Sequence, residues 1–230
     1  DTEITYMRRA GKVIEGVYER VMKVAKPGMR KNDLVAEIMH AGAQGHQGHY
    51  GDYTSFVPLI GAGDEAAACH MTWNDQELNN NEGMFLELAG AYARYHCPCS
   101  RTLFLGSPPQ QYLDIEKVIS ECIENAISMF KPGNTCAEIS DNFTATLKKY
   151  GYEKNNRCGY PIGLSYPPDW GERTMSLRGT DQTILQENMT FHFMPAIWFD
   201  DWGFEMTESI RVGKDGGECL SKVPRQLLVK

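Results

Sequence analysis

The chain has 230 residues, of which 42% are hydrophobic and 23% are charged, and its 23 basic and 30 acidic side chains give a net charge of −7. A chain of this size buries enough apolar surface to fold without disulfides, and its acidic balance argues against nucleic acid as the main ligand. No apolar run is long enough for a membrane span or a secretory signal, and seven cysteines without zinc-ribbon spacing predict reduced thiols in the cytoplasm.

An internal duplication organises the predicted elements. In chain order, a helix with apolar residues at helical spacing over 14–24 precedes a Lys-Pro-Gly turn at 26–28, and a second helix follows. Short alternating strands come next and end on a strand at 100–106. The same order returns from a second Lys-Pro-Gly at 131–133, 105 residues later, and closes on a strand at 207–213.

This repeat predicts an α+β fold in which each half contributes two helices and a hairpin of short strands. We expect a curved antiparallel sheet with the helices packed on its outer face. The chain is predicted to be a single domain over residues 1–230, with pseudo-symmetric halves at about 1–106 and 107–230. The uncovered concave face between the halves is the expected place for a small-molecule site.

Two acidic residues in apolar strands are candidates for this concave face. Glu87 sits between two leucines, and burying an unpaired carboxylate is costly, so Glu87 needs a partner or a function. In the last strand, period-2 alternation puts Glu208 on one face with Met206 and turns Glu205 and Thr207 away. We therefore expect Glu87 and Glu208 to face the site together.

Two histidines and two tryptophans complete the candidates from the residues alone. The duplication places His192 opposite Glu87, although a histidine in an apolar strand is more often a satisfied core residue. Nothing local explains His70, and an imidazole beside carboxylates suits general acid and base work. Trp170 and Trp202 lie in polar, glycine-flanked segments, where they are predicted to form a rim or lid over a ligand unless they pack in the core.

The segments 86–106, 159–174 and 188–209 contain most of these residues and resemble the pita-bread family of creatinases, prolidases and methionine aminopeptidases. The resemblance covers essentially the whole chain and implies a duplicated α+β catalytic domain. Metallopeptidase members hold two divalent cations with two Asp, one His and two Glu. Those five positions fall here on Glu87, Pro98, Tyr160, Met194 and Glu208. Two carboxylates are too few for hard cations, so no metal and no other cofactor is expected.

Within this family the sequence is most similar to the ectoine hydrolase branch, whose members act without metal. The resemblance implies hydrolytic opening of a cyclic amidine, a small zwitterion with an amidinium ring and a carboxylate. Glu87 would attack the ring carbon or activate water, Glu208 would pair with the amidinium, and His70 would move the proton. Arg173 would bind the substrate carboxylate. The implied substrate-binding residues are Tyr160, Trp170, Arg173, His192 and Trp202.

The resemblance also sets expectations for the whole protein. Larger family members carry a separate N-terminal domain that reaches the partner's active site in a dimer. We expect this chain to lack that domain, and the full-length protein to be a cytoplasmic homodimer without a membrane or nucleic-acid partner. Two other functions stay open: a metal-dependent Xaa-Pro dipeptidase or aminopeptidase, and a non-catalytic peptidase-like module that binds proteins.

Overall fold

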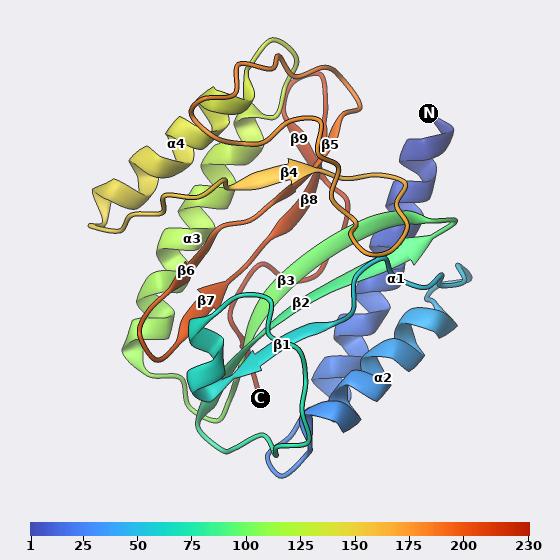
Figure 1. Ribbon diagram of the computed structural model, residues 1–230, viewed down its shortest axis with the longest axis vertical. Helices are drawn as coiled ribbons and strands as arrows, with labels where there is room; N and C mark the ends of the chain where they lie inside the picture. Colours follow the sequence, from blue (N-terminus) through green and yellow to red (C-terminus); the bar gives the residue numbers. More distant parts are fainter.

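The computed structural model describes residues 1–230 and has the predicted α+β architecture, with two helix pairs on opposite flanks of the strands (Figure 1). The pairs are α1 (Thr2–Val24) with α2 (Lys31–Gln44), and α3 (Gln110–Met129) with α4 (Cys136–Lys149). None of these helices combines the length and the apolar character that crossing a bilayer requires. All seven cysteines are free thiols.

The strands form two four-stranded sheets and one separate hairpin. The first sheet has the order β1 (Leu59–Ala62), β2 (Glu82–Tyr92), β3 (Tyr95–Leu105), β10 (Leu228–Val229), and a short 3-10 helix, η1 (Gly63–Ala67), follows β1. The second sheet has the order β4 (Gly159–Pro161), β5 (Thr190–Phe193), β8 (Glu208–Val212), β9 (Gly217–Cys219), and β6 (Ala196–Trp198) pairs with β7 (Gly203–Glu205). All pairings are antiparallel except that of β10 with β3.

Each helix pair covers its own sheet with a separate apolar core. Ile14 and Val17 of α1 pack with Leu86 of β2 in the first core, and α3 and α4 pack with β5 in the second. Gly90 allows α1 to lie directly on β2, because a Cβ at this position would stand 2.2 Å from the carbonyl oxygen of Ala10. The helices therefore cover one face of β2 and β3, and the other face holds Glu87, Ser100 and Thr102 among apolar side chains.

The two Lys-Pro-Gly turns adopt the same backbone arrangement. Gly28 and Gly133 both have positive φ, 80° and 96°, a conformation that favours glycine. Their N–H groups donate to the carbonyls of Leu78 and Leu185, respectively, and so connect each helix pair to the strands that follow it. The boundary predicted near residue 106 is crossed at the end of the chain, since β10 joins the first sheet.

Candidate active site

Glu87 points away from the helices, into what we call the inner face of β2 and β3. Its neighbours Leu86 and Leu88 belong to the core under α1, so strand alternation turns Glu87 to the other side. Ser100 of β3 lies beside it in the strand register. Glu87 is 4% exposed, and the buried Ser100 Oγ has no hydrogen-bond partner. Buried polar groups without partners are rare, which makes this inner face a candidate ligand site.

A second buried acid, Glu205, shares this inner face. The N–H of Glu205 donates to Thr102 Oγ1 at 2.8 Å, and the Thr102 hydroxyl donates back to the Glu205 carbonyl at 3.0 Å, which holds β7 on β3. Glu205 is 4% exposed and its Oε2 has no partner. The expectation that Glu205 points away from the site is therefore wrong.

The two acids change each other's titration. Burial raises the pKa of Glu205 to about 7, against the opposing charge of Lys154. Burial raises the pKa of Glu87 well above its usual range, and the charge of Glu205 raises it further. Like charges in one desolvated place favour the protonated form, so this pair retains a proton at a pH where ordinary carboxyls are ionised.

Lys154 is the cation of this cluster, and nothing in the sequence singled it out. It lies in the polar segment between α4 and β4, where its Nζ donates to the carbonyl of Met194 at 2.8 Å. Burial lowers the pKa of Lys154, and the charge of Glu205 opposes this. One lysine facing two acids leaves the cluster acidic when all three are ionised, which suits a cationic ligand.

Glu208 lies on the opposite face, so its predicted place beside Glu87 is wrong. Its carboxylate accepts a hydrogen bond from Arg101 Nη2 at 2.6 Å, and the two side chains are 1% and 0% exposed. Arg101 follows the alternation of Cys99 and Leu103, which pack in the core under α1. The predicted alternation in this strand is correct, but the face was inverted: Thr207 turns inward and Glu208 outward.

Thr207, His192, Tyr160 and Trp170 form one hydrogen-bonded chain on the inner side. Ser100 N–H donates to Thr207 Oγ1 at 2.8 Å, and the same oxygen lies 2.7 Å from His192 Nε2. His192 Nδ1 lies 3.0 Å from Tyr160 Oη, and Trp170 Nε1–H donates to the same oxygen at 2.8 Å. Trp170 and His192 together hold the Tyr160 hydroxyl in place.

This chain of hydrogen bonds is neutral. Burial lowers the pKa of His192 to about 3, and the charges of Lys154 and Arg157 lower it further. Burial raises the pKa of Tyr160 above its usual range, and the charge of Glu87 adds to the effect. His192 therefore positions Tyr160 and is not a proton acceptor at neutral pH. The structure brings Tyr160, Trp170 and His192 together, and their contact with substrate stays a prediction.

His70 lies at the edge of this cluster. It is exposed, has a left-handed backbone with φ 61°, and its ring centre is 6.0 Å from that of Phe56. Phe56 in turn lies 5.5 Å from Trp170. The adjacent residue, Cys69, is close enough to the acids for their charges to contribute to its raised pKa, after the larger effect of burial. The role of His70 in moving a proton stays a prediction.

Arg173 and Trp202 lie outside the cluster of acids, contrary to expectation. The Arg173 side chain is 86% exposed, and it lies 3.9 Å from Asp169. Trp202 stacks on Phe199 at 4.3 Å and lies 4.5 Å from the ring of Tyr112 on α3. Arg173 lies in irregular backbone after the bridge between Gly171 and Ile162, and the indole of Trp202, in the β6–β7 turn, packs on neighbouring aromatic rings.

The donor set does not match a metal centre of the kind that the family resemblance describes. Of the five positions expected to carry metal ligands, Pro98 and Met194 offer no side-chain oxygen, and Glu208 is engaged by Arg101 on the outer face. No group of three or more His, Cys, Asp or Glu side chains is arranged to hold a metal ion. Glu87 and Glu205 alone provide too few oxygen ligands for a hard divalent cation.

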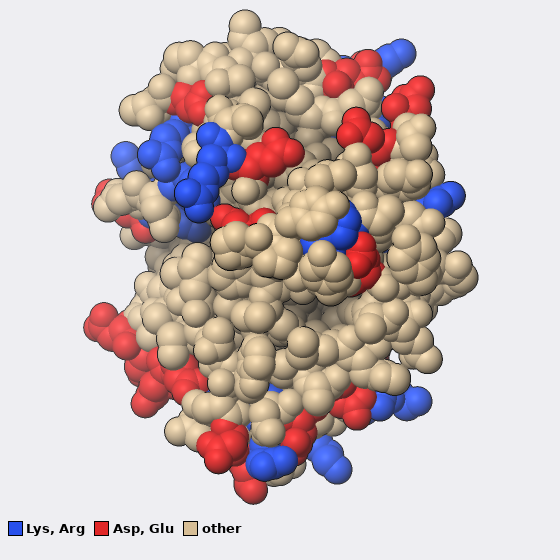
Figure 2. Space-filling view, turned by 45° about the vertical axis from the view of Figure 1, so that its right-hand side comes forward, with Lys and Arg blue, Asp and Glu red and all other residues tan.

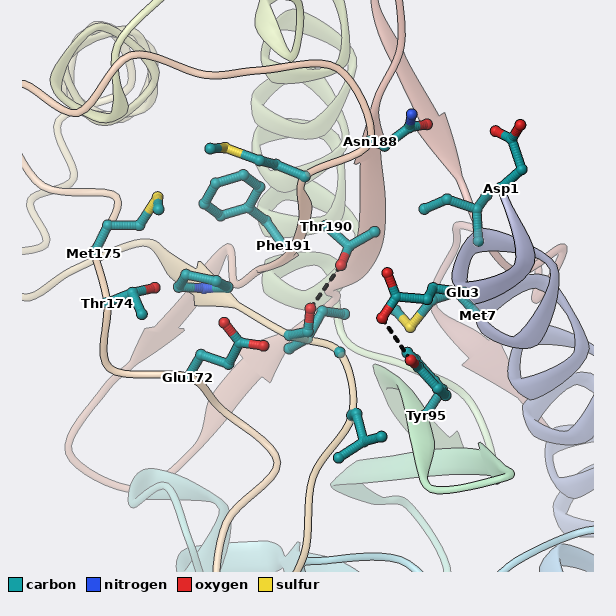
Figure 3. Close-up of a pocket in the computed structure, with 16 residues that line it drawn as sticks. Asp1, Glu3, Met7, Tyr95, Glu172, Thr174, Met175, Asn188, Thr190 and Phe191 are labelled. Carbon is teal, nitrogen blue, oxygen red and sulfur yellow. Dashed lines mark hydrogen bonds between the residues drawn. The ribbon is translucent and has the colours of Figure 1, made fainter.

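Two open pockets of about 350 Å³ and 340 Å³ are lined by neither Glu87 nor Glu205. One of about 350 Å³ lies between the start of α1 and the β4–β5 region, where Glu3 accepts a hydrogen bond from Tyr95 (Figure 3). Its lining includes none of the predicted site residues.

Charged side chains of both signs are spread over the face in Figure 2, with the largest group of Lys and Arg at its left edge. In contrast to the charged side chains on this face, the acids Glu87 and Glu205 are buried.

The match to a family model decides the family. Residues 5–215 match the model described as Metallopeptidase family M24. The chain belongs to this family. It is 50% identical over 99% of its length to an ectoine hydrolase of Halomonas elongata, and 39% identical over its whole length to an uncharacterized hydrolase/peptidase of Sinorhizobium fredii. The chain spans 59% of the length of each of these two relatives.

Solved structures of other members share the fold. An X-Pro aminopeptidase of Thermotoga maritima superposes with a TM-score of 0.87 at 20% identity, over 100% of this chain and 63% of that one. A prolidase of Pyrococcus horikoshii gives 0.88 at 22% identity, over 99% of this chain and 64% of that one. The predicted family and fold class are confirmed.

Proposed function

We propose that the full-length protein is a hydrolase that opens a small cyclic amidine and that ectoine is its substrate. The 50% identity to an ectoine hydrolase over 99% of this chain supports the substrate. The fold of family M24 supports a hydrolytic reaction but not a particular one, because one fold hosts several chemistries.

The observation that carries the proposal is the buried pair Glu87 and Glu205. Glu205 Oε2 is buried without a hydrogen-bond donor, and Glu87 beside it is 4% exposed. An amidinium presents N–H donors in a plane, as a guanidinium does, and pairs with carboxylates through charged hydrogen bonds. Such a cation would satisfy both acids at once, and Glu205 takes the role that the sequence assigned to Glu208.

The reaction adds one water molecule across a carbon–nitrogen bond of the ring. A carbon–oxygen bond forms at the ring carbon, the carbon–nitrogen bond breaks, and the departing nitrogen receives both protons of the water, so that the amidinium gives an amide and an ammonium group. We assign Glu87 to the ring carbon, as nucleophile or as the base that takes a proton from water. A bound amidinium favours the ionised form of both acids, and Glu205 is assigned to pass a proton released from water to the departing nitrogen.

A panel of substrates tests the function. Ectoine, hydroxyectoine, creatine and Xaa-Pro dipeptides are offered to the full-length protein, and amine release is followed. We expect turnover of ectoine and of its hydroxylated form, with no dipeptide cleavage, because a neutral peptide bond lacks the cationic N–H donors that Glu87 and Glu205 are proposed to bind. Cleavage of the dipeptides without ectoine turnover would identify a peptidase.

Metal removal tests the second part of the proposal. Because the donors on the inner face are too few for a hard cation, we expect ectoine turnover to change by less than about twofold after dialysis against a chelator. Elemental analysis before and after dialysis is the control. An activity lost in chelator and restored by Mn²⁺ would show a metal-dependent enzyme.

The raised pKa of Glu205 predicts how stability depends on pH. A carboxyl with a pKa of about 7 when folded and about 4.3 when unfolded binds more protons in the folded state, so the free energy of unfolding falls as pH rises between these values. Glu205→Gln should flatten this fall by about 4 kcal/mol. Urea unfolding from pH 4 to 8 measures it, with Glu82→Gln as the control; an unchanged slope would contradict the shifted titration.

We also propose that the full-length protein works as a homodimer in the cytoplasm. The seven free thiols agree with a reducing compartment. Analytical ultracentrifugation of the full-length protein tests the dimer, and a sedimentation coefficient typical of a monomer would contradict it.

A further inference from the structure

Arg157 is a cation without a partner beside the cluster of acids. It lies in the segment between α4 and β4, is partly buried, and makes no hydrogen bond or ion pair. Its guanidinium carbon stands 4.6 Å from the ring centre of Tyr160. A planar guanidinium held over an aromatic ring keeps its N–H groups free at the edge for an anion.

The other cations around the site are committed to partners. These are Lys154 on the Met194 carbonyl, Arg101 on Glu208 and Arg94 on Asp52. Arg157 is thus the cation that a substrate anion can reach without breaking an existing contact. It also differs from Arg173, because it is not a freely exposed side chain.

Arg157 and Glu87 shift the pKa of the same tyrosine, Tyr160, in opposite directions. The charge of Glu87 raises the pKa of Tyr160, whereas the charge of Arg157 lowers it. Arg157 also lowers the pKa of His192, after the larger effects of burial and of Lys154. Tyr160 is therefore close to both a negative and a positive group, an arrangement that matches a ligand carrying both charges.

We propose that Arg157 binds the carboxylate of a zwitterionic amidine while Glu87 and Glu205 bind its amidinium. This inference rests on the proposed hydrolysis of a cyclic amidine, and it transfers to Arg157 the role expected of Arg173. The fork of a guanidinium matches a carboxylate with two parallel hydrogen bonds, so Arg157 selects amidines that carry an acid group.

The test compares two ligands on the full-length protein. One is ectoine, and the other is the same methyl-tetrahydropyrimidine ring without its carboxylate. Dissociation constants are measured by calorimetry and KM by amine release, for the wild type, Arg157→Gln, Arg157→Lys and the control Arg173→Gln. Circular dichroism and the melting temperature establish that each variant is folded.

We expect Arg157→Gln to weaken ectoine binding about 10- to 100-fold, the size of a lost charged hydrogen bond. Binding of the ring without the carboxylate should change less than threefold, Arg157→Lys should lie between, and Arg173→Gln should match the wild type. An equal loss for both ligands, or no loss for either, would overturn the role of Arg157. If the wild type binds ectoine in a way that depends on Arg157 but does not turn it over, the binding role of Arg157 is supported and the proposed hydrolase activity is refuted.

Discussion

Glu87→Gln is expected to lower kcat for ectoine by about 100- to 10,000-fold. The substitution keeps the shape of the side chain but replaces the carboxylate, whose oxygen attacks the ring carbon or takes the proton from water, with an amide. It also removes a buried carboxyl whose pKa is raised well above its usual range, so the folded protein should lose no stability. Steady-state rates and the melting temperature measure the two effects separately.

The matched control is Glu82→Gln at the start of the same strand, where the carboxylate binds Asn79 instead of facing the inner side. This variant should keep nearly the wild-type kcat. A Glu87→Gln variant with near-normal rates would remove Glu87 from the reaction. In the wild type, peptide mass spectrometry after a rapid acid quench distinguishes a nucleophile from a base. Only a nucleophile leaves a substrate-sized adduct on the peptide that contains Glu87.

The face on which Glu87 lies could be predicted from strand periodicity because one face of β2 is clearly apolar. Leucines on both sides of Glu87 fix the face that packs under α1, so the acid must occupy the other. In the segment from Phe204 to Glu208 every residue is buried, whichever face it occupies. Alternation then shows which residues share a face but not which face is the inner one. The face of Glu208 is decided by Arg101 of β3, which binds its carboxylate.

The charged residues of the segment between α4 and β4 have no comparable signal. Lys154 and Arg157 occupy irregular backbone, where neither helical nor strand spacing applies. Their approach to Glu205 and Tyr160 depends on how this segment returns across the second sheet. The same applies to Arg173, whose position within a recognisable motif did not indicate that its side chain would point into solvent.

Glu208→Gln is expected to lower the free energy of unfolding by about 3 to 5 kcal/mol, the cost of leaving a buried charge without its partner. Arg101 would keep its carbonyl acceptors on Thr207, Val223 and Pro224 but lose the carboxylate that neutralises it. For a domain of this size the melting temperature should fall by about 10 °C. Urea unfolding and thermal melts measure both quantities.

The control for this loss is Glu218→Gln, which breaks partly exposed ion pairs with Arg8 and Arg211 and should cost less than about 1 kcal/mol. At a temperature where Glu208→Gln is folded, its kcat and its KM for ectoine should stay within about twofold of the wild type, because the carboxylate lies on the face that the substrate does not reach. Weak ectoine binding in a variant of unchanged stability would return Glu208 to the site. The opposite outcomes of Glu87→Gln and Glu208→Gln thus separate the two faces of one sheet: loss of the inner acid removes chemistry, and loss of the outer acid removes stability.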